Sequence, residues 1–111
     1  MDSIAAGYFQ NVLREFASGQ AREHSYRPAL KALIEAIDPT VQAINEPKRQ
    51  EVGAPDFIIN RKGIPVAFIE AKDVDVSLDA VEKSEQIKRY QGLGNLLVTN
   101  CLEFRLCIIK K

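Results

Sequence analysis

Residues 54–72 read APDFIINRKGIPVAFIEAK, and this stretch decides the fold. Two apolar runs, at 57–59 and 64–69, flank a short polar segment, which predicts a β-hairpin. Glu70 and Lys72 follow the second run at alternate positions, so both side chains point to one face of that strand. Charged side chains are seldom placed in a buried strand unless they are paired or bound to a metal. We therefore expect the chemistry of the domain at this end of the hairpin.

The length of the hairpin loop decides whether Asp56 shares a face with Glu70. A three-residue loop at 61–63, with Gly63 left-handed beside a bulge, pairs Asp56 with Phe68 and brings the two carboxylates together. A two-residue loop reverses the parity and places Asp56 on the opposite face. A shared site therefore requires an odd loop or a compensating bulge, and Gly63 is in position to supply one.

The composition is that of an ordinary globular domain. The chain has 111 residues, 46% hydrophobic and 27% charged, and we expect one domain spanning 1–111. The formal net charge is zero, so contacts to a polyanion must come from local basic patches. The candidates are Lys48-Arg49, Arg61-Lys62, Lys83 and Lys88-Arg89. We find no signal peptide, no apolar run long enough to cross a membrane and no cysteine framework, so we expect a cytoplasmic protein without a membrane partner.

Hydrophobic periodicity along the chain predicts an α/β fold. Ser25 is expected to cap the second helix, with Pro28 in its first turn, and Ser77 to open a third helix that Gly92 closes. The predicted elements are helices at 3–17, 25–38 and 77–91, and strands at 41–44, 54–59, 64–72, 96–99 and 104–109. The crossover through the third helix favours parallel strands, so we expect a mixed central sheet of about five strands flanked by helices on both faces.

The strand motifs resemble those of the PD-(D/E)xK nucleases. Pro55-Asp56 corresponds to the first half of that motif and Glu70-Ala71-Lys72 to the second, and the order of elements is similar to the family's core. The resemblance implies a restriction-endonuclease-like fold and a Mg²⁺-dependent deoxyribonuclease, with Mn²⁺ as a second usable metal. It implies that Asp56, Glu70 and the backbone carbonyl of Ala71 bind the metal. Lys72 would then orient the attacking water or help to deprotonate it.

Two residues of the third predicted helix resemble a DNA-contacting element, which implies that the partner is double-stranded DNA. Gln86 and Tyr90 are four positions apart, so they are neighbours on one helix face. They resemble the Gln-x-x-x-Tyr element of Mrr-like and type I restriction nucleases, which is associated with DNA contact. Lys88 and Arg89 would add phosphate contacts. The competing interpretation is a solvated Gln86 and a Tyr90 packed in the core.

Many nucleases of this family take a further metal ligand from an N-terminal helix, and Glu23 is the residue we expect in that role. It lies at the start of the second predicted helix, where Arg27 would steady it. Glu15 and Glu35 are the competitors. His24 is expected to be a surface residue.

Segments 95–100 and 103–105 resemble the nuclease domains at the N-terminus of single-chain type ISP restriction–modification enzymes. The resemblance implies a domain excised from a longer chain with helicase-like and methyltransferase domains, and a second nuclease copy for double-strand cleavage. Three alternatives stay open. They are a junction resolvase or repair nuclease on the same fold, a DNA-binding module without catalysis, and an interaction domain in which Glu70 and Lys72 form a structural ion pair.

Overall fold

The computed structural model describes residues 2–21, 23–45, 55–84, 87–88 and 95–107. In chain order the elements are α1 (Asp2–Ala17), η1 (Glu23–Tyr26), α2 (Arg27–Ile37), β1 (Val41–Asn45), β2 (Phe57–Arg61), β3 (Ile64–Ala71), α3 (Leu78–Glu82), β4 (Leu96–Thr99) and β5 (Phe104–Cys107). The five strands form one sheet in the order β1-β2-β3-β4-β5, with β3 and β4 parallel and the other neighbours antiparallel. The predicted mixed sheet is confirmed.

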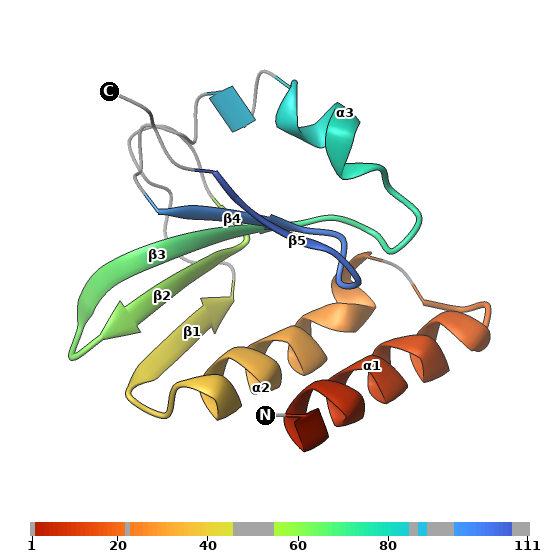
Figure 1. The fold of residues 1–111 in the computed structure, drawn as a ribbon, viewed down its shortest axis with the longest axis horizontal. Coiled ribbons are helices and arrows are strands. Elements are labelled where there is room, and N and C mark those ends of the chain that lie inside the picture. Colours follow the sequence, from red (N-terminus) through yellow and green to blue (C-terminus); the bar gives the residue numbers. More distant parts are fainter. Residues whose placement is uncertain (1, 22, 46–54, 85–86, 89–94, 108–111) are drawn as a thin grey trace.

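Helices cover both faces of the sheet, α1 and α2 on one and α3 on the other (Figure 1). Alternation along the strands sends successive side chains to the two helix layers. Phe57 and Ile69 pack with the α1 and α2 side chains, whereas Ile58 and Phe68 pack with Leu78 of α3 and its neighbours. Among the described residues, no helix is long and apolar enough to cross a membrane.

The β2–β3 hairpin turns through two residues, not three. Arg61 lies opposite Ile64, and Lys62 and Gly63 occupy the turn with φ of 53° and 78°. Two consecutive left-handed residues give the turn whose twist matches that of the flanking strands. Glycine adopts this conformation at no steric cost, which accounts for Gly63 at the second position. The three-residue loop considered from the sequence is therefore wrong.

A β-bulge in β3 restores the parity that this turn would otherwise reverse. The register shifts at the 59–60 step of β2, where Val66 is the extra residue of β3. If this register is continued by one residue before Phe57, Asp56 lies opposite Glu70. The three-residue loop would have placed Asp56 opposite Phe68. The compensating bulge expected from the sequence is present, but it lies at Val66 and not beside Gly63. One inserted residue thus brings the two carboxylates to the same face.

The second helix begins differently from the prediction. Ser25 does not cap it: the residue at the N-cap of α2 is Tyr26, which makes no side-chain capping hydrogen bond. The short η1 turn leads directly into α2, so the backbone is already helical at Tyr26, and burial of Tyr26 and Arg27 holds this junction. Pro28 lies in the first turn as predicted, where its missing N–H is harmless.

The third helix is shorter than predicted. Ser77 precedes it as expected, but α3 ends at Glu82, so an uninterrupted helix to Gln91 is wrong. The hydroxyl of Ser84 donates to the carbonyl of Val81 at 2.7 Å and accepts from the backbone N–H of Ile87 at 3.3 Å. A serine that bonds the backbone in this way competes with the helical hydrogen bonds. The expected closure at Gly92 lies outside the described residues.

The outer edge of β1 is covered by two side chains of α2. Lys31 Nζ donates to the carbonyl of Ala43 at 2.6 Å and to Glu35 Oε2 at 2.7 Å, and that carboxylate accepts the Ala43 N–H at 2.9 Å. The hydrogen bonds from Lys31 and from the Ala43 N–H hold the pKa of Glu35 below its usual value, and the bond from Lys31 has the larger effect. Both backbone groups of Ala43 are therefore unavailable for pairing with another strand.

Asp38 organises the turn between α2 and β1. Its Oδ1 accepts hydrogen bonds from the hydroxyl of Thr40 at 2.6 Å and the Thr40 N–H at 2.9 Å, and Oδ2 accepts from Arg61 Nη2 at 2.6 Å. These bonds favour the ionised form and lower the pKa of Asp38 to about 2. The two bonds from Thr40 contribute more to this shift than the bond from Arg61 does. This exposed ion pair lies beside the hairpin turn, at the opposite end of β2 from Asp56.

Candidate active site

Glu70 is a buried carboxylate near the end of β3. Its side chain is only 4% exposed, since the apolar residues of β3 and β4 surround it. Glu70 Oε2 lies 3.3 Å from Nζ of Lys72, while Oε1 has no hydrogen-bond partner among the residues that the structure describes. A buried oxygen without a partner is rare in folded proteins and marks a place where a ligand or ion is to be sought.

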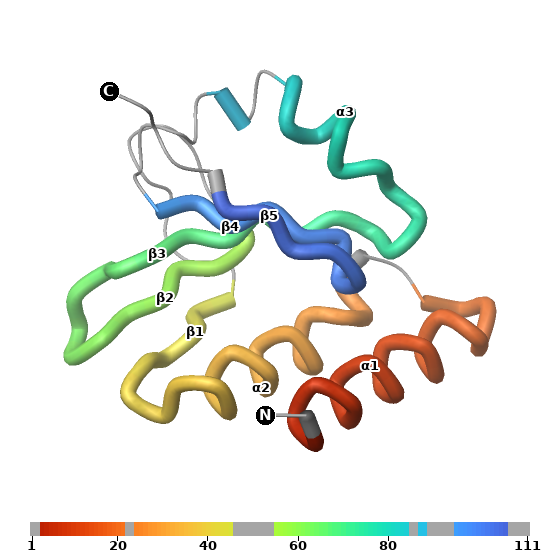
Figure 2. The backbone as a smooth tube through the Cα atoms, in the orientation of Figure 1, coloured from red at the N-terminus to blue at the C-terminus, as the bar shows by residue number. Residues whose placement is uncertain are grey.

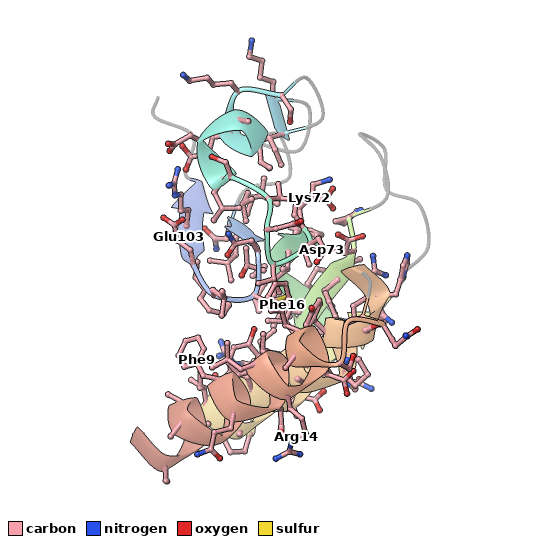
Figure 3. The ribbon with its side chains drawn as sticks, turned by 90° about the vertical axis from the view of Figure 1, so that its right-hand side faces the viewer. Phe9, Arg14, Phe16, Lys72, Asp73 and Glu103 are labelled. Atoms are coloured by element: carbon pink, nitrogen blue, oxygen red, sulfur yellow. The ribbon has the colours of Figure 1, made fainter. Side chains whose placement is uncertain are left out.

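Lys72 shares the face of Glu70 because it lies two positions further along the strand direction. Its backbone N–H donates to the carbonyl of Thr99 at 2.8 Å, which extends the pairing of β3 with β4 past Ala71. The side chain is one-quarter exposed, so the ammonium group lies at the boundary between the buried carboxylate and solvent. Figure 3 views the side on which β3 ends, with Lys72 and Asp73 lying between α3 and the α1–α2 layer.

Asp56 follows the buried Pro55 and precedes β2, and both of its oxygens are held. Oδ1 accepts from Arg27 Nη2 at 2.7 Å, and Oδ2 accepts from the backbone N–H of Ala71 at 2.8 Å. The second bond replaces a strand–strand bond at the end of the hairpin, so the carboxylate is attached to the same segment that carries Glu70. Its orientation is fixed by two elements distant in sequence.

The two carboxyl groups interact with one another. Burial raises the pKa of Glu70 to about 7, and the nearby negative charge of Asp56 acts in the same direction, while Lys72 opposes them. Arg27 and Lys72 each place one positive charge beside this pair, but for Glu70 the effects of burial and of the Asp56 charge outweigh that of Lys72. Glu70 therefore favours either a retained proton or a cation bound beside it.

Arg27 is a site residue whose contacts the sequence interpretation did not foresee. Its buried guanidinium binds Asp56 and also donates from Nη1 to Asn45 Oδ1 at 3.1 Å. The expected contact with Glu23 stays a prediction, because the Glu23 side chain lies outside the described part of the structure. Helical spacing contained a signal for this position, because Arg27 precedes Leu30 by three residues and so lies on the buried stripe of α2. A charged residue on such a stripe needs a partner of opposite charge.

Two carboxylates, one with an unpartnered buried oxygen, form a donor set suited to a hard divalent cation. A metal of this kind takes oxygen ligands and usually keeps several waters, so two protein carboxylates are enough to anchor it. Among the described residues, no group of three or more histidine, cysteine, aspartate or glutamate side chains converges. The oxygen donors of the two carboxylates are of the kind that Mg²⁺ or Mn²⁺ would fit.

Known proteins share the fold of this chain. No family model and no curated protein matches the sequence. A chain from the cryo-electron microscopy structure of the DrdV–DNA complex superimposes with a TM-score of 0.69 at 17% identity, covering 87% of this chain and 73% of that one. The shared fold is the mixed five-stranded sheet flanked by helices. At this identity the likeness concerns the fold alone, and the predicted fold class is confirmed.

The remaining predicted residues have different outcomes. Lys88 is exposed and its backbone is helical, as is that of Ile87, and its predicted role in DNA binding stays a prediction. The other three DNA-binding candidates, Gln86, Arg89 and Tyr90, lie outside the described residues.

The predicted acidic ligand from the N-terminal helices also stays a prediction. Glu23 belongs to the η1 backbone, but its side chain lies outside the described part of the structure. Of its competitors, Glu15 is exposed on α1, and Glu35 is held by Lys31 at the edge of β1.

Proposed function

We propose that this is the nuclease domain of a restriction–modification enzyme, a metal-dependent endonuclease that hydrolyses phosphodiester bonds of double-stranded DNA. The observation that carries the proposal is the meeting of Asp56 and Glu70 across a bulged hairpin, with Lys72 on the same face. The shared fold with a protein solved in complex with DNA supports the same conclusion. The finer proposal is an Mrr-like domain of the type ISP group.

Each residue of the site has a distinct role in this proposal. Asp56, Glu70 and the backbone carbonyl of Ala71 would hold Mg²⁺ or Mn²⁺, with Glu23 as a further ligand. When bound, the metal supplies charge stabilisation at the phosphate and lowers the pKa of a coordinated water. Lys72, held 3.3 Å from Glu70, orients the attacking water and offsets the negative charge that develops on the phosphate oxygens.

The proposal extends to DNA contacts and partners. Gln86 and Tyr90, with Lys88 and Arg89, would contact the duplex from the segment after α3. Because the chain has no net charge, the affinity of this domain alone for DNA is expected to be weak. Helicase-like and methyltransferase domains of a longer chain would supply further binding, and a second nuclease copy would cut the other strand.

Plasmid cleavage with Mg²⁺, with Mn²⁺ and with EDTA tests the proposal, using wild type, Asp56→Asn and Lys72→Met at high protein concentration. We expect cleavage that requires metal and is lost in both variants. Asp38→Asn is the matched control, because it removes a carboxylate from the other end of β2, and we expect it to cleave as wild type does.

A Mg²⁺ titration followed by NMR separates catalysis from metal binding. We expect the amide signals of residues 56 and 70–72 to shift in wild type and in Lys72→Met, but not in Asp56→Asn. Shifts without cleavage would favour a DNA-binding module that lacks catalysis. If neither shifts nor cleavage are observed at millimolar metal, the proposal is refuted. The Glu70–Lys72 contact would then be a structural ion pair.

A further inference from the structure

We infer that Arg27 is a positioning residue of the proposed metal site, which orients Asp56 from the start of α2. The inference rests on the proposed function, because it assigns a role in that same site. Arg27 lies outside the strand motifs, and its contacts alone connect it to the site.

The guanidinium joins three elements at the end of the sheet where the carboxylates meet. Its Nη2 lies 2.7 Å from Asp56 Oδ1, and its Nη1 lies 3.1 Å from Asn45 Oδ1 at the end of β1. The planar fork of arginine makes both contacts from one rigid group, which lysine cannot do. Asp56 precedes β2 and lies outside its ladder, so side-chain contacts must determine its rotamer.

The burial of this contact distinguishes it from a surface ion pair. The Arg27 and Asp56 side chains are 6% and 17% exposed, whereas the Arg61 and Asp38 side chains are 47% and 35% exposed. Buried partners that orient a metal ligand typically change metal affinity or activity by about 10–100-fold when they are lost. Exposed pairs have little effect on their surroundings.

The geometry also defines which oxygens remain for a cation. Arg27 and the Ala71 N–H each donate to one oxygen of Asp56, and within the described part of the chain Glu70 Oε1 has no hydrogen-bond partner. With Asp56 held from both sides, its carboxylate is presented toward Glu70 before any cation arrives. Loss of the arginine fork would let Asp56 rotate, so the two carboxylates would be less often in position together.

Arg27→Lys tests the inference, because it keeps the positive charge and removes the fork. We expect the Mg²⁺ dissociation constant, measured from NMR shifts at residues 56 and 70–72, to rise by about 10-fold or more. The Mg²⁺ concentration for half-maximal cleavage should rise in parallel. A residue that only stabilised the fold would lower the melting temperature and leave the Mg²⁺ affinity of the folded protein unchanged.

Two further variants complete the experiment. Asn45→Ala removes the exposed second acceptor and leaves the buried pair in place, so it remains informative if Arg27→Lys does not fold. We expect it to weaken Mg²⁺ binding by an intermediate factor, while Arg61→Lys, the same change in an exposed pair, should bind Mg²⁺ as wild type does. If Arg27→Lys and Asn45→Ala both bind Mg²⁺ with wild-type affinity, the positioning role of Arg27 is overturned and the proposed function is not affected. Absence of Mg²⁺ binding by wild type would overturn the proposed function and this inference together.

Discussion

Replacing Glu70 by glutamine should make the metal-free protein more stable at alkaline pH. In the folded state, burial and Asp56 raise the pKa of Glu70 from 4.5 to about 7. The folded protein therefore holds this proton more tightly than the unfolded chain does. As the pH rises from about 4.5 to about 7, the free energy of unfolding falls, and above that range the loss is complete.

The size of the effect follows from the same values. A pKa difference between 4.5 and about 7 corresponds to about 3 kcal/mol of unfolding free energy. Glutamine keeps the shape of the protonated acid and never ionises. We therefore expect the free energy of unfolding of Glu70→Gln to exceed that of wild type by about 3 kcal/mol at pH 8.5 in EDTA. At pH 5 the two free energies should differ little.

Urea denaturation at pH 5 and pH 8.5, in EDTA and in Mg²⁺, measures both parts of this prediction. Mg²⁺ at ten times its dissociation constant should stabilise wild type by about 1.4 kcal/mol at pH 8.5 and leave Glu70→Gln nearly unchanged. Asp38→Asn is the control, because Asp38, with a pKa of about 2, stays ionised across this range. Parallel pH profiles for wild type and Glu70→Gln, or a less stable variant at pH 8.5, would refute the reasoning.

Three further predictions concern contacts that hold the fold together in other parts of the domain. Tyr8→Phe removes a buried 2.7 Å hydrogen bond to the carbonyl of Cys101, and urea denaturation should show a loss of about 1–2 kcal/mol; an unchanged midpoint would contradict this. Glu35→Gln should speed hydrogen exchange of the Ala43 N–H, measured by NMR, because its charged acceptor is lost; equal protection would argue against the edge contact. The lowered pKa of Asp38 stabilises the folded state above pH 3.8, and this contribution disappears as the pH falls toward 2, so Asp38→Asn should show a weaker decline of melting temperature with acid than wild type.

Local patterns determined most of the architecture. Helical spacing of apolar residues predicted the first helix to within one residue at its start, and apolar runs located all five strands. Gly63 signalled the hairpin turn, and the alternation of Glu70 and Lys72 placed both on one face. These predictions succeeded because helices and strands are periodic over a few residues, and the order of apolar and polar residues along the chain shows that period.

Side-chain competition over short distances was harder to foresee. Ser84 interrupts the third helix by bonding backbone groups on either side of it, although the residue pattern favoured a continuous helix. Tyr26, not Ser25, occupies the N-cap of α2, where burial of its ring outweighs the preference for a small polar cap. In both cases several local solutions were compatible with the sequence, and packing selected one.

The order of residues along the chain was enough to select Asp56, Glu70 and Lys72 as the candidate site, because each is a charge attached to an apolar strand. Only the tertiary structure decided how they meet. Their common face depends on one extra residue at Val66, which changes strand parity without leaving a periodic signal. The partner of Asp56 is Arg27, from an element 29 residues earlier in the chain. Such a contact arises when the start of α2 packs against the end of the sheet, and no local pattern encodes that distance.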